Sequence, residues 1–208
     1  MIKIYGDIAS GNCYKIKLLT CLLNIPHDWV TIDILSGETQ SDTFRAINPA
    51  AQIPLLQLED GRHLAQSNAI LHLLAEGSDL LPSNKFDHAQ VLQWQFFEQY
   101  SHEPYIAVAR FIARYLGLPD DKLAEYKSKQ AGGHNALKVM QEQLLKSDWL
   151  AANRYTIADI SLYAYTHVAH EGGFNLNEYP AILNWIKRIE DHPKHQTMQA
   201  MLAEQEGL

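Results

Sequence analysis

Hydrophobic and polar positions in the first part of the chain switch between strand-like and helix-like periods. Over residues 2–5 apolar and polar side chains alternate, which predicts a β-strand. Leucine and isoleucine then recur at helical spacing over residues 16–23, and the Asn-Ile-Pro sequence that follows is typical of a helix end. Alternation returns over residues 30–34, so we expect a second strand there.

The same switching continues to residue 77. A short helix is predicted over residues 41–47, stopped by the Asn-Pro pair that follows. Two short apolar runs flank Asp60-Gly61, which predicts a β-hairpin. Ser67 is the predicted N-cap of an apolar helix that Gly77 closes. The order is βαβαββα, with the first two strands parallel and the last two antiparallel, as in a thioredoxin-like α/β domain.

Strand patterns stop beyond this region, and helical periodicity takes over. Residues 78–87 hold a proline, two serines and two aspartates, so we interpret them as a linker. We therefore expect a thioredoxin-like domain over residues 1–77 and an all-helical domain over residues 88–208. The segments predicted to be helical in the second domain are 88–115, 120–146, 157–170 and 179–192.

Composition narrows the class of protein. The 208 residues carry a net charge of −7, which gives no reason to expect nucleic acid or an anionic membrane as a partner. We see no signal-peptide pattern, and no apolar stretch approaches the roughly 20 residues of a spanning helix. Cys13 and Cys21 lie eight positions apart on a predicted helix, roughly 12 Å of rise, which is too far for a disulfide. The reducing cytoplasm is the expected compartment.

The stretch ASGNCYK, residues 9–15, raises the first chemical question. Ser10-Gly11-Asn12-Cys13 has the spacing of a C-x-x-C redox motif whose first cysteine is replaced by serine. Ser10 holds the position just ahead of the helix, whereas Cys13 falls within its first turn, where a side chain tends to pack inward. We expect Cys13 to be structural. The rival interpretation is that the Cys13 thiol forms a mixed disulfide with a small thiol.

Four stretches in this order resemble the soluble glutathione transferase family, and the resemblance covers the whole chain. The first turn is most similar to the serine-bearing, theta-like or nu-like bacterial branches, because Tyr5 lies within a predicted strand rather than in the loop. The four stretches are ASGNCYK (9–15), NPAAQIPLL (48–56), DGRHLAQSNAI (60–70) and TIAD (156–159).

The resemblance implies that glutathione is a co-substrate and that no further cofactor or metal is needed. Ser10, seconded by Asn12, would stabilise the thiolate of glutathione, and which of the two is the main donor stays open. The Ile53-Pro54 bond would be cis, so that the Ile53 backbone pairs with the peptide-like ligand; a trans proline opening a strand is the alternative. A homodimer is also implied.

Further binding residues follow from the same resemblance. Ser67 would hold the γ-glutamyl carboxylate at a helix N-terminus, and Gln66 the α-amino end, although many relatives carry glutamate there. Gln52 and Gln40 are candidates for the glycyl carboxylate; otherwise they are plain surface residues.

The aromatic stretch over residues 94–115 is expected to contribute to the pocket for a second, hydrophobic substrate and to a subunit interface. Tyr105 and Arg110 are the candidate pocket residues. Thr156 and Asp159 have the spacing of a capping-box variant and are interpreted as structural. The ten histidines form no recognisable metal-binding spacing.

The function that this pattern favours is a cytoplasmic glutathione transferase of the detoxification type, which activates glutathione for attack on small hydrophobic electrophiles. Two alternatives remain at this point. One is a glutathione-dependent peroxidase or disulfide reductase on the same fold. The other is a non-catalytic protein of the same fold that acts through protein contacts.

Overall fold

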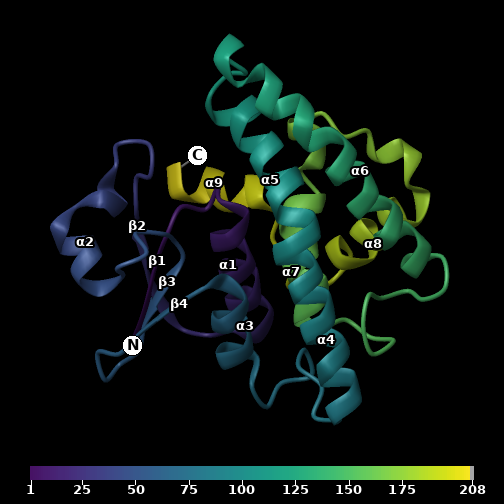
Figure 1. Ribbon diagram of the computed structural model, residues 1–208. Helices are drawn as coiled ribbons and strands as arrows, with labels where there is room; N and C mark the ends of the chain where they lie inside the picture. The colour runs from purple at the N-terminus through teal and green to yellow at the C-terminus, as the bar shows by residue number, and fades with distance from the viewer. Residues whose placement is uncertain (207–208) are drawn as a thin grey trace. The chain divides into compact units, whose positions relative to one another are not determined.

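The computed structural model describes residues 1–206 (Figure 1). The chain forms two compact units. The first contains Met1–Ser78 together with the chain from Pro193 onward, and the second contains Asp79–His192. No helix among residues 1–206 is both long and apolar enough to cross a bilayer.

The first unit is built on a four-stranded sheet in the order β2-β1-β3-β4. The strands β1 and β2 are parallel, and the other two pairings are antiparallel. The parallel β1-β2 pair and the antiparallel β3-β4 hairpin are as the sequence predicts. The elements of this unit are β1 (Ile2–Gly6), α1 (Gly11–Leu23), β2 (His27–Thr31), a 3-10 turn (Glu38–Gln40), α2 (Asp42–Ile47), β3 (Leu55–Gln57), β4 (His63–Ala65), α3 (Ser67–Ala75) and α9 (Met198–Glu206).

The second strand begins and ends earlier than its hydrophobic alternation predicts. The prediction placed it at 30–34, whereas β2 ends at Thr31. The reason is Asp33, whose carboxylate accepts the backbone N–H groups of Leu35 (2.9 Å) and Ser36 (3.0 Å). Such an aspartate turn bends the chain away from the sheet although apolar residues continue.

The two faces of the sheet are covered by different helices, with α1 and α3 on one side and α2 on the other (Figure 1). Alternation along the strands decides which residues meet which helices. Leu55 joins a buried cluster with Phe44 of α2 and Ile32. Its neighbour Leu56 points the opposite way and is fully buried, as is its cross-strand partner Ile4.

The C-terminal segment belongs to the first unit. The Tyr14 hydroxyl donates to the Gln196 carbonyl at 2.8 Å, and Gln205 Nε2 donates to Thr31 Oγ1 at 2.7 Å. Met198 and Met201 are buried. These contacts hold the segment against α1 and the edge strand β2, an arrangement that hydrophobic periodicity does not indicate.

The second unit is helical, as predicted. The long segment predicted over residues 88–115 forms two helices with π-helical turns, and every residue of the later α7 is buried. The elements are α4 (Lys85–Phe97), a π turn (Glu98–His102), α5 (Glu103–Arg110), a π turn (Phe111–Tyr115), a 3-10 turn (Asp120–Lys122), α6 (Leu123–Leu144), α7 (Ile157–Thr166), two 3-10 turns (Ala169–Gly172 and Leu176–Glu178) and α8 (Pro180–Glu190).

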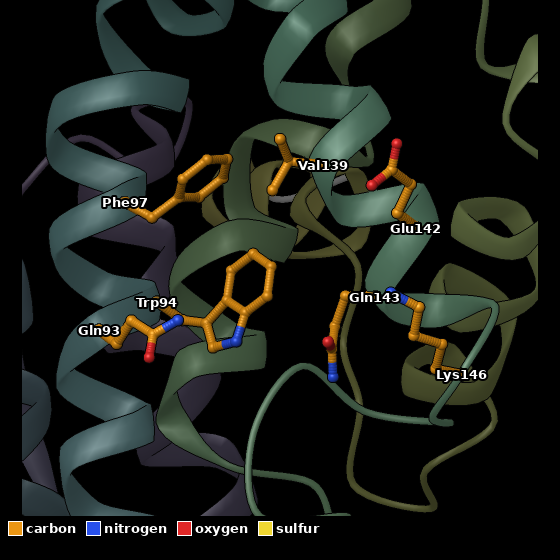
Figure 2. Close-up of a pocket in the computed structure, with 7 residues that line it drawn as sticks. All are labelled: Gln93, Trp94, Phe97, Val139, Glu142, Gln143 and Lys146. Carbon is orange, nitrogen blue, oxygen red and sulfur yellow. The ribbon is translucent and has the colours of Figure 1, made fainter.

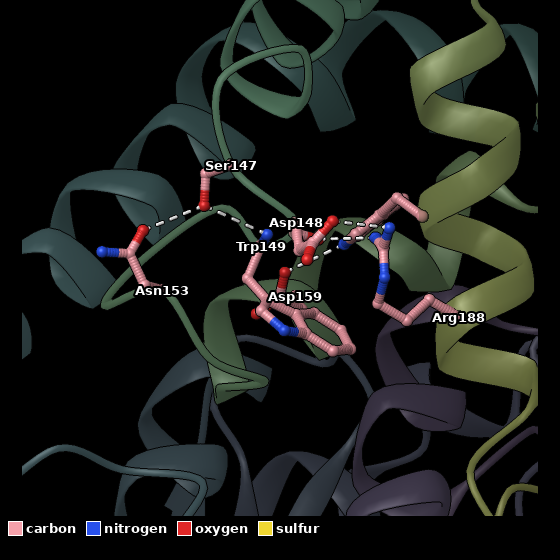
Figure 3. Close-up of polar contacts among 7 residues, drawn as sticks. Ser147, Asp148, Trp149, Asn153, Asp159 and Arg188 are labelled. Atoms are coloured by element: carbon pink, nitrogen blue, oxygen red, sulfur yellow. Dashed lines mark hydrogen bonds and ion pairs between the residues drawn. The ribbon is translucent and has the colours of Figure 1, made fainter.

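The capping box at the start of α7 is confirmed. Thr156 Oγ1 accepts from the Ala158 N–H at 3.3 Å, and the Asp159 carboxylate accepts from the Thr156 N–H at 2.9 Å. Asp159 also accepts from Trp185 Nε1 of α8 at 2.9 Å. The loop that precedes α7 also contacts α8, because Asp148 of the loop pairs with Arg188 of α8 at 2.8 Å (Figure 3). The cap therefore fixes α7 and α8 together.

Candidate functional site

Three of the sequence motifs meet at one end of the sheet. Leu55 of β3 pairs with Tyr5 of β1 on one side and with Ala65 of β4 on the other. Pro54 directly precedes Leu55, and Gln66 directly follows Ala65. The turn that follows β1 leaves the sheet at the same end. Residues separated by more than fifty positions are thus brought to the same end of the sheet.

Ser10 ends the turn after β1 and begins α1. Its N–H donates to the Asp7 carbonyl at 3.0 Å, and its carbonyl accepts from the Tyr14 N–H at 2.9 Å. The dihedral angles, φ −74° and ψ 123°, are those of an N-cap, but the hydroxyl accepts no hydrogen bond from the helix backbone. Capping therefore does not occupy the Ser10 hydroxyl.

Cys13 lies one turn further and is fully buried. Burial raises the pKa of its thiol to about 12, and hydrogen bonds with the Asp7 backbone and the Ser10 side chain offset this only in part. Only a thiolate acts as a nucleophile, so this cysteine stays inert at neutral pH. A Cβ on Gly6 would lie 3.0 Å from Cys13 Sγ, so glycine makes room for the thiol. These observations support the structural interpretation of Cys13.

Asn12 connects the first turn of α1 to α3. Its Oδ1 accepts from Lys15 Nζ at 2.8 Å and from Ser67 Oγ at 2.9 Å. Lys15 Nζ also lies 3.4 Å from Ser67 Oγ. The amide oxygen of Asn12 therefore faces both of these donors.

Lys15 is the residue that sequence reasoning missed. Its side chain is fully buried, on a helix whose neighbouring inward positions are apolar. A charged residue on the apolar face of a helix, three positions after Asn12, is the sequence signal that indicates such a contact. The buried ammonium adds positive charge beside Ser67, at the N-terminus of α3.

The prediction that Ser67 is the N-cap of α3 is wrong. The N-cap is Gln66, whose carbonyl accepts from the Ile70 N–H at 3.0 Å, and Ser67 is the first helical residue. The Ser67 hydroxyl is directed to Asn12 instead of to its own helix. Gln66 has φ 72° and ψ 112°, a strained conformation for a residue with a side chain, and the side chain is exposed. Residues with strained backbone conformations are found more often at functional sites.

The Ile53-Pro54 peptide bond is cis, which confirms the prediction. Ile53 is half-buried against the cluster that contains Phe44, and Pro54 is buried. The pairing of the Ile53 backbone with a ligand stays a prediction.

The two remaining glutamines of the predicted site are exposed. The Gln52 carbonyl accepts from Asn48 Nδ2 at 2.7 Å, which shapes the loop before Pro54. Gln40 lies in the 3-10 turn before α2, where its Oε1 accepts from Arg45 Nη2. The structure therefore adds a cation, Arg45, next to Gln40.

Tyr105 and Arg110 have defined places in the helical unit. The Tyr105 ring covers Gly132 of α6, where an added Cβ would lie 2.2 Å from the ring. Arg110 is only 4% exposed, and its Nε contacts Glu171 Oε2 at 2.6 Å. Their contact with a second substrate stays a prediction.

The helical unit has a cavity between α4 and α6 and another along α5. One, of about 270 Å³, opens between α4 and α6 and is lined by Gln93, Trp94, Phe97, Val139, Glu142, Gln143 and Lys146 (Figure 2). The other, of about 320 Å³, follows α5 and its flanking π turns, with α7 contributing one residue, and is lined by Gln99, Glu103, Pro104, Ala107, Val108, Phe111 and Tyr165. Neither lining includes Tyr105 or Arg110.

Comparison with known proteins gives consistent matches over nearly the whole chain. Residues 9–76 match the model of the glutathione S-transferase N-terminal domain, and residues 91–193 match the C-terminal domain. A glutathione S-transferase from Pseudomonas fluorescens is 56% identical, with a TM-score of 0.93 over 95% of this chain and 98% of that one. One from Xanthobacter autotrophicus is 38% identical, with a TM-score of 0.89 over both full chains. Protein URE2 from Candida albicans is 25% identical over 91% of this chain and 67% of its own length.

Proposed function

The chain belongs to the glutathione S-transferase family, and we propose that it is an active transferase that binds glutathione and lowers the pKa of its thiol for attack on a small hydrophobic electrophile. The observation that carries the proposal is the contact of Asn12 and Lys15 with Ser67, at the end of the sheet where Ser10 and Pro54 also lie. A site for an anionic peptide and a hydroxyl for its thiol are thereby close together.

Glutathione binding is assigned to the edge of the sheet and the start of α3. The Ile53 backbone would pair with the peptide backbone of glutathione as an added strand. The first N–H groups of α3 would hold the γ-glutamyl carboxylate, with the buried Lys15 ammonium adding attraction. The Ser67 hydroxyl, which donates its one proton to Asn12 Oδ1 in this structure, would turn to the carboxylate when glutathione binds. Gln66 would accept from the α-amino group.

Activation of the thiol is assigned to Ser10, with Asn12 as second donor. A free thiol has a pKa near 8.5, and lowering it by about two units requires roughly 2.7 kcal/mol in favour of the thiolate. A hydroxyl, an amide and the N-terminus of α1 supply interactions of that size. The orientation of Asn12 supports this role, because its contacts with Lys15 and Ser67 are made by its amide oxygen, and donation to a thiolate would use the amide nitrogen.

The glycyl carboxylate is assigned to Gln40 and Gln52. Both are neutral donors, and the neighbouring Arg45 supplies the charge that the two glutamines lack. An arginine beside a carboxylate binds more strongly than an amide does.

The second substrate is assigned to the cavity along α5. Its volume is within the usual range for small-ligand pockets, and its wall is largely apolar. The structure of this chain does not favour the mixed-disulfide alternative, because the Cys13 thiol is buried and protonated.

The protein is further proposed to be a homodimer with a role in detoxification in the cytoplasm. The dimer proposal is supported by aromatic side chains that are exposed along α4 and the turn after it: Phe86 (71%), Phe96 (68%) and Tyr100 (85%). Exposed aromatic residues in such a group are typical of a protein interface.

The proposal is tested by calorimetric titration with glutathione, followed by a panel of halides, epoxides, isothiocyanates, hydroperoxides and mixed disulfides. Binding at physiological glutathione concentrations together with conjugation of at least one electrophile is the expected result. If glutathione binds but only hydroperoxides or disulfides are turned over, the assignment changes from a transferase to a peroxidase or reductase. Absence of binding at millimolar glutathione would overturn the proposal.

A further inference from the structure

The cavity along α5 has a polar end and an apolar wall. Pro104, Ala107 and Val108 line the wall along one side of α5, and Phe111 continues it into the next turn. Glu103, at the start of α5, is the one charged residue among the described residues that line the cavity. A ligand that fills the cavity therefore places an apolar body against the wall and meets a single negative charge.

The neighbouring Gln99 has a fixed orientation. Its Nε2 donates to Glu98 Oε2 at 2.8 Å and to Glu103 Oε2 at 2.6 Å. Two carboxylates thus hold the amide nitrogen. Gln99 and Glu103 both line the polar end of the cavity, and each carries side-chain oxygens that can accept hydrogen bonds.

The local backbone explains how two carboxylates share one amide. The Glu103 N–H donates to the Glu98 carbonyl, which closes the π turn over Glu98–His102. In a π turn, residues five apart come into register along the helix axis. Glu98 and Glu103 are the two residues that this backbone hydrogen bond joins, and Gln99 lies between them in the sequence. Turns of this type inside α-helices occur frequently at functional sites.

We infer that this cavity selects electrophiles in which an apolar body carries a cationic or hydrogen-bond-donating head group, and that Glu103 determines this preference. That the bound compounds are electrophiles rests on the proposed function. The binding preference itself does not depend on catalysis. An ammonium group gains a charge-assisted hydrogen bond at the polar end. A carboxylate of the same shape meets like charge and finds acceptors where it needs donors.

The test uses three probes of nearly identical shape, phenylbutylamine, phenylbutanol and phenylbutyrate, titrated into the full-length protein at neutral pH without glutathione. We expect the amine to bind about five- to tenfold more tightly than the alcohol, and the carboxylate to bind more weakly than both. In Glu103→Gln the amine and the alcohol should bind within about twofold of each other. Glu142→Gln, on α6 in the other cavity, is the matched control and should keep the original order.

A second variant locates the binding site. Ala107→Trp should fill the cavity and weaken all three probes at least tenfold, with circular dichroism to verify folding; Val108→Phe replaces it if that variant does not fold. Equal binding of the three probes by the wild type, a preference that survives Glu103→Gln, or unchanged binding to the filled variant would each overturn the inference. Failure of glutathione to bind in a separate titration would instead overturn the proposed function and leave this preference standing.

Discussion

The Ser67 hydroxyl donates to Asn12 Oδ1 at 2.9 Å and so joins the first residue of α3 to the first turn of α1. The two residues are 55 positions apart in the sequence. One belongs to the proposed carboxylate site and the other to the proposed thiolate site. The contact therefore joins the proposed γ-glutamyl carboxylate site to the proposed thiolate site through one hydrogen bond.

Ser67→Ala should affect binding more than turnover. The change removes the hydroxyl that would turn from Asn12 to the carboxylate on binding, a contact present in both the ground state and the transition state. We expect the apparent glutathione constant to rise about tenfold, with less than a threefold change in kcat. Steady-state kinetics at varied glutathione measures both values, with the exposed Ser83→Ala as control. An unchanged glutathione constant would contradict the assigned role.

Ser10→Ala should have the opposite effect. Loss of one thiolate donor should lower conjugation about ten- to a thousandfold and shift the thiolate absorbance of the bound complex to higher pH. The fold should be little affected, because the Ser10 hydroxyl does not cap α1. Cys13→Ala is the companion variant and should leave conjugation nearly intact. A silent Ser10→Ala with an inactive Asn12→Ala would identify the amide as the donor, and loss of activity in Cys13→Ala alone would refute the transferase interpretation of this turn.

A pair of glutamine variants tests the two ends of the peptide. Gln66→Glu places a negative charge beside the proposed α-amino group and should tighten glutathione binding about two- to fivefold. Gln52→Glu places the same charge beside the proposed glycyl carboxylate and should weaken binding by a similar factor. Both side chains are exposed, so the two substitutions are matched in burial. Calorimetric titration measures the glutathione affinity of both variants. If both substitutions change the affinity in the same direction, one of the two assignments is wrong.

Asp159 should make stability depend on pH in the helical unit. Burial raises the pKa of this carboxyl to about 6 from its ordinary value of 3.8, although hydrogen bonds from Trp185, Leu150 and Thr156 partly offset the burial. Between about pH 4 and pH 6 the unfolded chain loses this proton while the folded protein keeps it. The contribution to the free energy of unfolding is therefore full at low pH and falls by roughly 3 kcal/mol as the pH rises to 6.

Urea unfolding at intervals from pH 4 to pH 7 measures this contribution as the difference between the wild type and Asp159→Asn. In Asp159→Asn this decrease in the free energy of unfolding between pH 4 and pH 6 should be absent. In the control Asp148→Asn, at an exposed side chain, the decrease should remain. Parallel pH curves for the wild type and Asp159→Asn would show that the carboxyl titrates normally.

Light scattering at micromolar concentration should give twice the chain mass of 23.6 kDa. Phe96→Asp, at a side chain that is 68% exposed, should shift the protein toward the monomer without unfolding it, because the residue is not part of the core. A wild-type mass of one chain would exclude a stable dimer.

The sequence by itself determined those features that depend on neighbouring residues. Alternating and helical periods specified the order of strands and helices over residues 1–77, because each period reflects one element burying one face. The Thr156–Asp159 capping box was predictable for the same reason, since its two side chains bond backbone groups within three positions. The Ile53-Pro54 bond was expected from a motif rather than from periodicity.

Only the tertiary structure decided the features that join distant segments. Ser67 looked like an N-cap, but its hydroxyl bonds Asn12 on another helix, and Gln66 takes the cap. Lys15 became part of the site because packing of α1 against α3 buries it beside Ser67. A local pattern reports which face of an element is buried, whereas the partner of a polar group depends on the residue that folding brings opposite to it.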